Sequence, residues 1–262
     1  MKISVCGKGG SGKSSVVALL ANEFASRGNH VLVVDSDESN SGLFRLLGFK
    51  NPPVPLMELV GGKKGLKERM AVRFSSGETE VKMDVLTQDK IQIKEITPPY
   101  IIGDGNLKLV SIGKIMQSLE GCACPMGVLS REFLRKLRLE ENEVVIVDME
   151  AGVEHFGRGV ETSIDSVVVV VEPSLESIEL AARIKKLSAD AGVERIAAVL
   201  NKVVSEDISR KLKDELVKRG VRVIGNIHYH SDIFEASLQG HKLAMVSGDE
   251  EIKQVVDCLT SD

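Results

Sequence analysis

The 262-residue chain contains no long run of apolar residues and no excess of positive charge. Apolar stretches such as Val167–Val171 are far shorter than the roughly 20 residues that a membrane-spanning helix needs. The chain has 34 lysines and arginines against 38 aspartates and glutamates, and its net charge of −4 gives no basic field to attract nucleic acid. We therefore expect neither a membrane nor a nucleic acid among its partners.

Cysteines are scarce too, and no linker or low-complexity tract divides the chain. Four cysteines do not form a disulfide framework, which is typical of a protein of the reducing cytoplasm. An apolar strand begins at the N-terminus at once, so we expect no signal peptide. With 43% hydrophobic and 27% charged residues, the composition is that of a globular protein, and we expect residues 1–262 to form one domain.

Residues 7–15 read GKGGSGKSS, which satisfies the pattern G-x-x-x-x-G-K-[ST] of phosphate-binding loops. The apolar strand Lys2–Cys6 precedes the loop, and apolar residues at helical spacing follow it. Such a turn directs backbone N–H groups at an anion, and glycines let the backbone close on the phosphates. We expect Lys13 to reach the β- and γ-phosphates of a nucleotide and Ser14 to ligate Mg²⁺. The expected ligands in the loop are Gly7, Gly9, Gly10, Ser11, Gly12, Lys13, Ser14 and Ser15.

Apolar, β-branched segments alternate with segments of helical pattern along the rest of the chain. Because strands that are apolar on both faces are typical of a covered parallel sheet, we predict an α/β fold. We expect a single P-loop domain with a mostly parallel central sheet and helices on both faces. The predicted strands are Val31–Asp35, Val144–Asp148, Ser166–Val171, Ile196–Leu200 and Val221–Ile227. The predicted helices include Arg131–Leu139, Leu175–Ala191 and Asp207–Arg219.

Residues 52–115 depart from this alternation. They hold five of the seven prolines and few clear helical patterns. We interpret them as an irregular surface insertion within the domain, with short strands near Val81–Leu86 and Leu107–Ile112.

Polar residues follow three of the predicted strands. Asp37 lies just past one strand, and Asp148 ends another in the Walker B pattern, so both are candidates to hold Mg²⁺ or orient water. Gly152 follows Asp148 and allows the backbone to approach the γ-phosphate. Asn201 and Lys202 end a later strand, where the asparagine amide is a candidate for recognising the base. Acidic or polar residues also end strands as solvated turns, but ligands of parallel sheets bind at this edge.

The lysine at position 8 points to a particular class of triphosphatase. The string K-G-G-x-G-K-[ST] resembles the deviant Walker A motif of the family that holds MinD, ParA, Mrp and the nitrogenase iron protein. The resemblance implies a homodimer that sandwiches ATP, in which Lys8 of one subunit reaches the phosphates bound to the other. It also implies that Asp37 positions the attacking water and that Asp148 and Gly152 belong to a second switch, D-x-x-A-G.

Two further stretches sharpen the resemblance. Residues 147–155 read VDMEAGVEH and are followed by Gly157-Arg158-Gly159, which resembles the D-M-x-A-G-[IV]-E-H-x-x-R-G stretch of CooC-type ATPases. Cys122-Ala123-Cys124 matches the C-x-C of the same subfamily. CooC-type proteins assist nickel insertion into carbon monoxide dehydrogenase, so the resemblance implies that apo-enzyme, or a related nickel enzyme, as a partner.

Cys122 and Cys124 are the candidate ligands for Ni²⁺ or Zn²⁺. Two thiolates cannot complete a four-coordinate site, whereas two chains related by a twofold axis supply four sulfurs. We therefore expect the metal at a dimer interface, with incidental or redox-active thiols as the alternative. Cys6 and Cys258 are interpreted as core residues. His155 is interpreted as structural, and His228 and His230 as part of a loop that borders the base.

Two other functions stay open at this stage. An iron–sulfur carrier or scaffold of the Mrp kind would use the same cysteines, but such carriers usually show C-x-x-C near the C-terminus. A positioning ATPase of the MinD or ParA kind needs a basic membrane-binding helix or a DNA-binding patch. Residues 249–262 instead contain five acidic residues, and Lys253 is their only basic residue, so the sequence does not favour this alternative.

Overall fold

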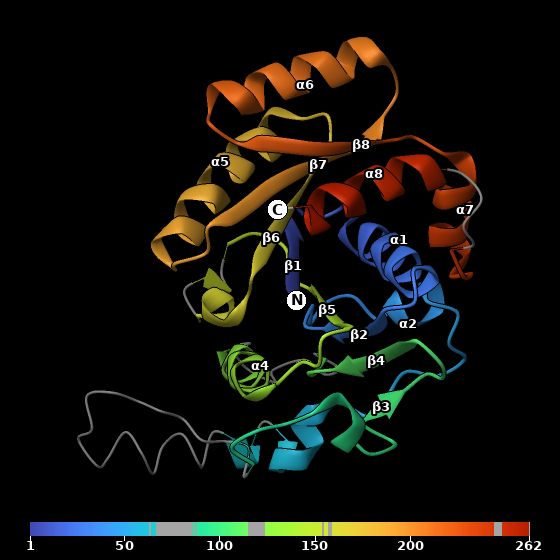
Figure 1. The fold of residues 1–262 in the computed structure, drawn as a ribbon, viewed down its shortest axis with the longest axis vertical. Coiled ribbons are helices and arrows are strands. Elements are labelled where there is room, and N and C mark those ends of the chain that lie inside the picture. Colours follow the sequence, from blue (N-terminus) through green and yellow to red (C-terminus); the bar gives the residue numbers. More distant parts are fainter. Residues whose placement is uncertain are drawn as a thin grey trace.

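A computed structural model describes residues 1–62, 64–66, 86, 88–114, 124–153, 155–156, 159–243 and 248–261. Within this part, one sheet of eight strands has the order β3-β4-β2-β5-β1-β6-β7-β8 (Figure 1). Neighbouring strands pair in parallel, except β3 with β4. The strands are β1 (Lys2–Gly7), β2 (His30–Asp35), β3 (Ile101–Ile102), β4 (Leu107–Ser111), β5 (Glu143–Asp148), β6 (Ser166–Val171), β7 (Arg195–Val203) and β8 (Arg222–His228).

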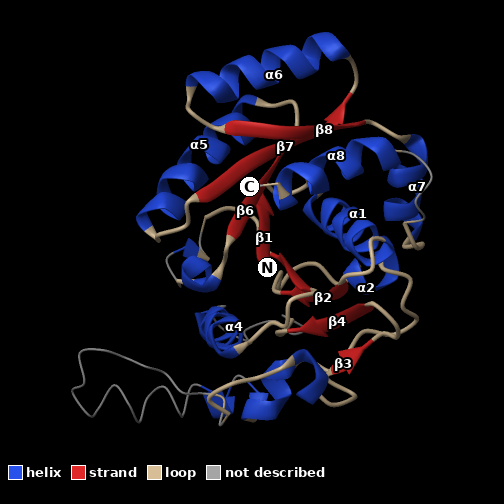
Figure 2. Ribbon diagram, viewed as in Figure 1, coloured by secondary structure: helices blue, strands red, loops and turns tan. Residues whose placement is uncertain are grey.

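Helices cover both faces of this sheet (Figure 2). On one face lie α1 (Lys13–Ser26), α2 (Leu43–Leu46), α7 (Ser231–Gln239) and α8 (Asp249–Thr260). On the other lie α4 (Cys124–Lys136), α5 (Leu175–Asp190) and α6 (Glu206–Lys218). Short 3-10 turns are η1 (Leu56–Val60), η2 (Ile93–Glu95) and η4 (Val160–Ser163). None of the helices in the described ranges combines the length and the apolar character that crossing a membrane requires.

Two hydrophobic cores flank the sheet because alternate strand residues point to opposite faces. In β6, Val168 and Val170 belong to the core shared with α1 and α8, whereas Val167 and Val169 belong to the core shared with α4 and α5. Each of these valines is at most 1% exposed. Burying one such side chain stabilises the fold by about 1.5–3 kcal/mol. The run of valines in β6 is thus buried on both faces, as its sequence predicts.

The α/β fold and the mostly parallel sheet are confirmed, and β6 spans the predicted residues. The short strand predicted near Leu107–Ile112 corresponds to β4, Leu107–Ser111. It does not lie at the surface, because it pairs in parallel with β2 and its Val110 is fully buried. A five-residue strand covered on both faces is hard to tell from a hairpin strand by its pattern alone. Of the other predicted strand, Val81–Leu86, residues 81–85 lie outside the described part, so this prediction stays untested.

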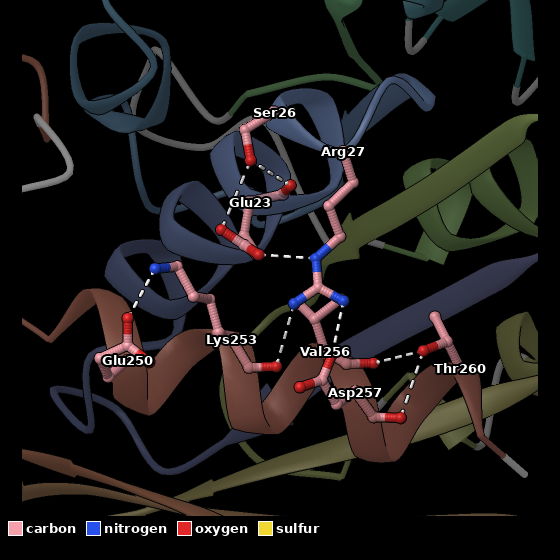
Figure 3. A network of polar contacts seen from close by, with 8 residues as sticks. All are labelled: Glu23, Ser26, Arg27, Glu250, Lys253, Val256, Asp257 and Thr260. Atoms are coloured by element: carbon pink, nitrogen blue, oxygen red, sulfur yellow. Dashed lines mark hydrogen bonds and ion pairs between the residues drawn. The ribbon is translucent and has the colours of Figure 1, made fainter.

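Arg27, just past the end of α1, ties that helix to α8 (Figure 3). Its guanidinium donates to Glu23 Oε1 and to Asp257 Oδ1, each at 2.6 Å, and to the Lys253 carbonyl oxygen at 3.2 Å. Glu23 is only 3% exposed, so its charge needs this partner. The contacts fix the far end of the helix that begins at the phosphate-binding loop.

Candidate functional site

The loop between β1 and α1 lies tightly against the neighbouring strands. A Cβ atom added to Gly7 would come within 2.5 Å of the Val170 carbonyl oxygen, and one added to Gly12 would collide with the Asn201 side chain. Gly12 also has a φ of 92°, in the left-handed region that other residues avoid. Glycine is therefore required at both positions for the loop to take this course.

A pocket of about 810 Å³ opens where strands β1, β2, β7 and β8 end. It is lined by the phosphate-binding loop, the segment after β2, the ends of β7 and β8, and helix α7. The structure therefore gathers residues from four separate parts of the chain that the sequence assigned to one site. The predicted site residues that line it are Gly9, Gly10, Gly12, Lys13, Ser14, Ser15, Asp37, Asn201 and Lys202.

The two lysines of the loop have different surroundings. Lys13 is 6% exposed and donates from Nζ to the Lys8 carbonyl oxygen at 3.3 Å. Lys8 does not line the pocket: its Nζ lies 3.2 Å from Glu176 Oε2 and 3.4 Å from Glu172 Oε1. The hydrogen bond that Lys8 donates to Glu176 raises the pKa of Lys8, so this side chain stays charged. Lys13 thus lines the pocket, whereas the ammonium of Lys8 lies beside Glu172 and Glu176.

Ser14, which is partly exposed, contacts the buried Asp148 next to Lys13. Ser14 Oγ donates to Asp148 Oδ2 at 2.6 Å and accepts a hydrogen bond of the same length from Asn40 Nδ2. Asp148 is fully buried, and its Oδ1 has no hydrogen-bond partner among the described residues. Burial, together with the charge of Asp35, raises the pKa of Asp148 to about 7. An unpaired carboxylate oxygen therefore lies beside the serine hydroxyl.

Asp35 stands directly opposite Asp148 in the register of β2 and β5. Burial raises its pKa to about 6, against the opposing effect of the Lys114 ammonium 2.6 Å from Asp35 Oδ1. Lys114 also donates to the carbonyl oxygens of Asp37, at 2.5 Å, and of Asn40. The buried carboxylates of Asp35 and Asp148 thus lie close to a largely buried lysine, Lys114, that bridges to the loop after β2.

The carboxylate of Asp37 organises that loop. Its Oδ1 accepts from Ser39 N at 2.9 Å, from Ser39 Oγ at 2.7 Å and from Asn40 N at 3.3 Å. No hydrogen bond to Oδ2 occurs among the residues that the structure describes. Because Asp37 lines the pocket, this second oxygen is the one available to a water molecule there.

Three other predicted ligands hold the phosphate-binding loop in place. Asn201 Nδ2 donates to the Ser11 carbonyl oxygen at 2.8 Å, and Lys202 Nζ donates to that of Gly10 at 2.5 Å. The backbone N–H of Gly152 donates to the Gly7 carbonyl oxygen at 3.2 Å. The amide nitrogen of Asn201, proposed from sequence to read the base, is thus engaged with the loop itself.

His228, at the end of β8, and His230, just past it, also line the pocket. His228 Nδ1 lies 2.5 Å from Glu251 Oε1, and His230 Nε2 lies 3.0 Å from Glu251 Oε2. Hydrogen bonding to Glu251 raises the pKa of His228. These histidines border the pocket as predicted, and the described ranges contain no cluster of three or more residues that could hold a metal ion.

The predicted cysteine site cannot be placed. Cys122, like the side chain of Cys124 at the start of α4, lies outside the described part of the structure. Of the two cysteines interpreted as core residues, Cys6 is fully buried and Cys258 packs half-buried against the core. His155 is 2% exposed, in agreement with a structural role.

Sequence reasoning missed Asn40 and Lys114. Asn40 lies three residues past Asp37, and Lys114 lies three residues past the end of β4, at the same edge of the sheet. The signal for Lys114 was a lysine just after an apolar strand, but that strand was assigned to a surface insertion.

Residues 3–243 match the model of the CobQ/CobB/MinD/ParA nucleotide binding domain. The chain belongs to this family. The matched region includes the loop with Lys8 and Lys13, the carboxylates Asp37 and Asp148, and Asn201. Family membership therefore agrees with a nucleotide pocket at this edge of the sheet.

Individual relatives cover most of the chain. An ATP-binding protein of Methanocaldococcus jannaschii is 43% identical over 261 residues, which are 99% of this chain and 100% of the relative. The carbon monoxide dehydrogenase accessory protein CooC of Rhodospirillum rubrum is 33% identical over 205 residues, 78% of this chain and 75% of CooC. The cell division ATPase MinD of Pyrococcus furiosus superposes with a TM-score of 0.69 at 19% identity, over 99% of this chain and 98% of MinD. This structure shares the fold, and the identity to CooC supports a CooC-like relationship.

Proposed function

We propose that this protein is a Mg²⁺-dependent ATPase that works as a homodimer and assists nickel insertion into carbon monoxide dehydrogenase or a related nickel enzyme. The observation that carries the ATPase is the contact between Ser14 and the buried Asp148 beside Lys13. The nickel function rests on the cysteine motif at positions 122 and 124 and on the 33% identity to CooC, which is named as an accessory protein of that dehydrogenase.

The residues around Ser14 fit a magnesium ion. Mg²⁺ prefers hard oxygen ligands, and a hydroxyl and a carboxylate meet here. Asp148 Oδ1 is buried without a partner among the described residues, which costs about 1–3 kcal/mol unless something binds it. Ser14, Asp37 and Asp148 are therefore the residues that would hold the ion, directly or through water. When bound, Mg²⁺ neutralises charge on the phosphates.

The chain's own side chains divide the remaining tasks. Lys13 and the backbone N–H groups at the start of α1 bind the phosphates of ATP. Asp37 orients the attacking water through Oδ2, the oxygen left available by its contacts with Ser39 and Asn40. Gly152 links the segment after Asp148 to the loop, so this segment responds to the loss of the γ-phosphate.

Dimerisation gives Lys8 its role. In the single chain, its ammonium lies between Glu172 and Glu176 on the outside of the loop, and it contributes nothing to its own pocket. These contacts are exposed to solvent and screened by it, and they are therefore weak. A partner's phosphates can displace them, so Lys8 stabilises negative charge in the other subunit as ATP is hydrolysed.

Nickel is the cargo of the proposed cycle. Cys122 and Cys124 of two subunits supply four thiolates to one ion across the twofold axis. ATP binding and hydrolysis change how the two subunits approach each other, and so change the geometry of the four sulfurs. The proposal therefore couples phosphate chemistry to the capture and release of nickel.

The test is the metal content of protein purified without oxygen. Nickel, zinc and iron are measured per dimer, with Mg·ATP and with Mg·ADP, for the parent and for the Cys122→Ser/Cys124→Ser variant. Cys258→Ser is the matched control, because this half-buried thiol lies on the last helix, α8. We expect one nickel per dimer in the parent and the control, and none in the double variant. Equal nickel in all three proteins would end the cysteine proposal, and iron with sulfide would favour the carrier function.

A further inference from the structure

The ammonium of Lys114 has three acceptors around it. It donates to Asp35 Oδ1 at 2.6 Å, to the Asp37 carbonyl oxygen at 2.5 Å and to the Asn40 carbonyl oxygen. An ammonium has three N–H groups, so every donor of this lysine is used. The side chain is only 14% exposed, which makes these hydrogen bonds costly to break without replacement.

We propose that Lys114 is a positioning residue for ATP hydrolysis: it holds the loop of residues 37–40 so that the Asp37 carboxylate faces the bound nucleotide. This inference rests on the proposed ATPase function. It assigns Lys114 no contact with the nucleotide, since Lys114 is not among the residues that line the pocket.

The position of the contacts supports this role. Lys114 donates to the backbone carbonyl oxygens at both ends of the short segment from Asp37 to Asn40. Within the segment, the Asp37 carboxylate accepts hydrogen bonds from the backbone N–H groups of Ser39 and Asn40. The orientation of that carboxylate is therefore set by two kinds of contact, one internal and one from Lys114. If the ammonium is removed, only the internal hydrogen bonds from Ser39 N and Asn40 N restrain the segment, and they open more often because the segment is no longer fixed to the end of β4.

A second contact of this loop, from Asn40 to Ser14, is weakened when a cation binds. Asn40 Nδ2 donates to Ser14 Oγ, the hydroxyl that fits a magnesium ligand. That contact competes with a cation, because the hydroxyl oxygen cannot serve both at full strength. Lys114 is then the contact that keeps the loop in place while the nucleotide is bound.

A different explanation is that Lys114 only balances the charge of Asp35. The two explanations separate in a double variant. Lys114→Met/Asp35→Asn removes both members of the ion pair, so no unbalanced charge remains. The carbonyl oxygens of Asp37 and Asn40 still lose their donor. Positioning predicts that turnover in this variant stays low, and charge balance predicts that it recovers.

Lys2 provides the matched control. Its ammonium is also buried and donates to two carbonyl oxygens, those of Leu134 at 2.5 Å and Leu137 at 2.9 Å, at the end of α4. It does not line the nucleotide pocket. Lys2→Met therefore reproduces the loss of a buried ammonium without touching the loop of Asp37.

The experiment measures kcat and KM for Mg·ATP in the parent and in Lys114→Met, Lys114→Arg, Lys2→Met and the double variant. Amide hydrogen exchange of residues 36–42 without nucleotide gives a readout independent of turnover. We expect kcat of Lys114→Met to fall about 100-fold with KM changed less than about threefold, as for a misplaced catalytic group. Exchange at Ser39 and Asn40 should rise in this variant alone among the single Met variants, and Lys114→Arg should regain at least a tenth of the parent's turnover.

The outcomes separate the two proposals. If the parent does not hydrolyse ATP, the proposed function fails and the exchange measurement still tests the hold of Lys114 on the loop. If the parent turns over and Lys114→Met matches it, the positioning role is wrong. It is also wrong if Lys2→Met loses the same factor, or if the double variant recovers. Should Lys114→Met not fold, Lys114→Arg decides: turnover below a tenth of the parent's with unchanged exchange overturns the inference.

Discussion

Replacing Asp148 with asparagine should make the nucleotide-free protein more stable, although it removes a proposed magnesium ligand. Asp148 is fully buried, and its Oδ1 has no hydrogen-bond partner among the described residues. In the unfolded chain its carboxyl has the ordinary pKa of 3.8, and in the folded chain burial raises the pKa to about 7. Between these pH values only the folded chain binds the proton, so the free energy of unfolding falls as the pH rises through this range.

The size of the effect follows from the two pKa values. At about 1.4 kcal/mol per pKa unit, ionised Asp148 costs the folded state up to about 4 kcal/mol above pH 7. Asparagine has nearly the same shape, does not ionise, and can still accept the hydrogen bond from Ser14 Oγ. Asp148→Asn should therefore raise the free energy of unfolding at pH 8 by up to about 4 kcal/mol, and this gain should shrink by roughly 2–3 kcal/mol at pH 5.

The assay is urea unfolding between pH 5 and pH 8.5, with EDTA and without nucleotide. Asp104→Asn, in an exposed turn before β4, is the control and should leave the pH dependence of the parent unchanged. A gain in Asp148→Asn that is equal at pH 5 and pH 8, or a loss of stability at pH 8, would refute the reasoning. The same variant should bind Mg·ATP poorly, as expected where stability and function oppose each other.

Three further predictions concern other parts of the chain. Lys8→Ala should still bind ATP with the parent's affinity, measured by calorimetry, but should lose at least about 10³-fold in kcat because no cation reaches the partner's phosphates; normal turnover would contradict the dimeric mechanism. Gly12→Ala should abolish ATP binding, because a Cβ there collides with Asn201 and the φ of 92° is strained; retained binding would show that the loop adapts. Arg27→Met should lower the free energy of unfolding by about 1–3 kcal/mol, because Glu23 is left buried without the guanidinium. Urea unfolding checks this, with Arg210→Met, an exposed side chain on α6, as the control; an equal effect of both would argue against it.

Much of the fold was predictable because strong local patterns agreed with the global arrangement. The valine run of β6 and the glycine loop before α1 each allow one structure, and the helix after Ser174 begins where its hydroxyl accepts from Ser177 N. The membership of β4 in the sheet was not predictable in the same way. It depends on a long-range pairing with β2 that no local pattern encodes.

The residues of the site also divide into those that a local motif predicts and those that only long-range contacts reveal. Lys13, Ser14, Asp37 and Asp148 follow from motifs whose spacing carries their chemistry, and the structure brings them together. Lys114 is 77 residues from Asp37 in the chain, and two of its three contacts are with backbone carbonyls that any residue supplies. No residue type at the loop marks it as the partner of a lysine, so only the three-dimensional arrangement shows it.

The most direct measurement of the central claim is the activation of nickel-free carbon monoxide dehydrogenase by this protein. Apo-enzyme is mixed with limiting nickel and Mg·ATP, and carbon monoxide oxidation is followed with the parent, the Cys122→Ser/Cys124→Ser variant and Lys8→Ala. We predict activation by the parent with ATP only, and none by either variant. Equal activation by the parent and the cysteine variant, or activation by the parent without ATP, would contradict it.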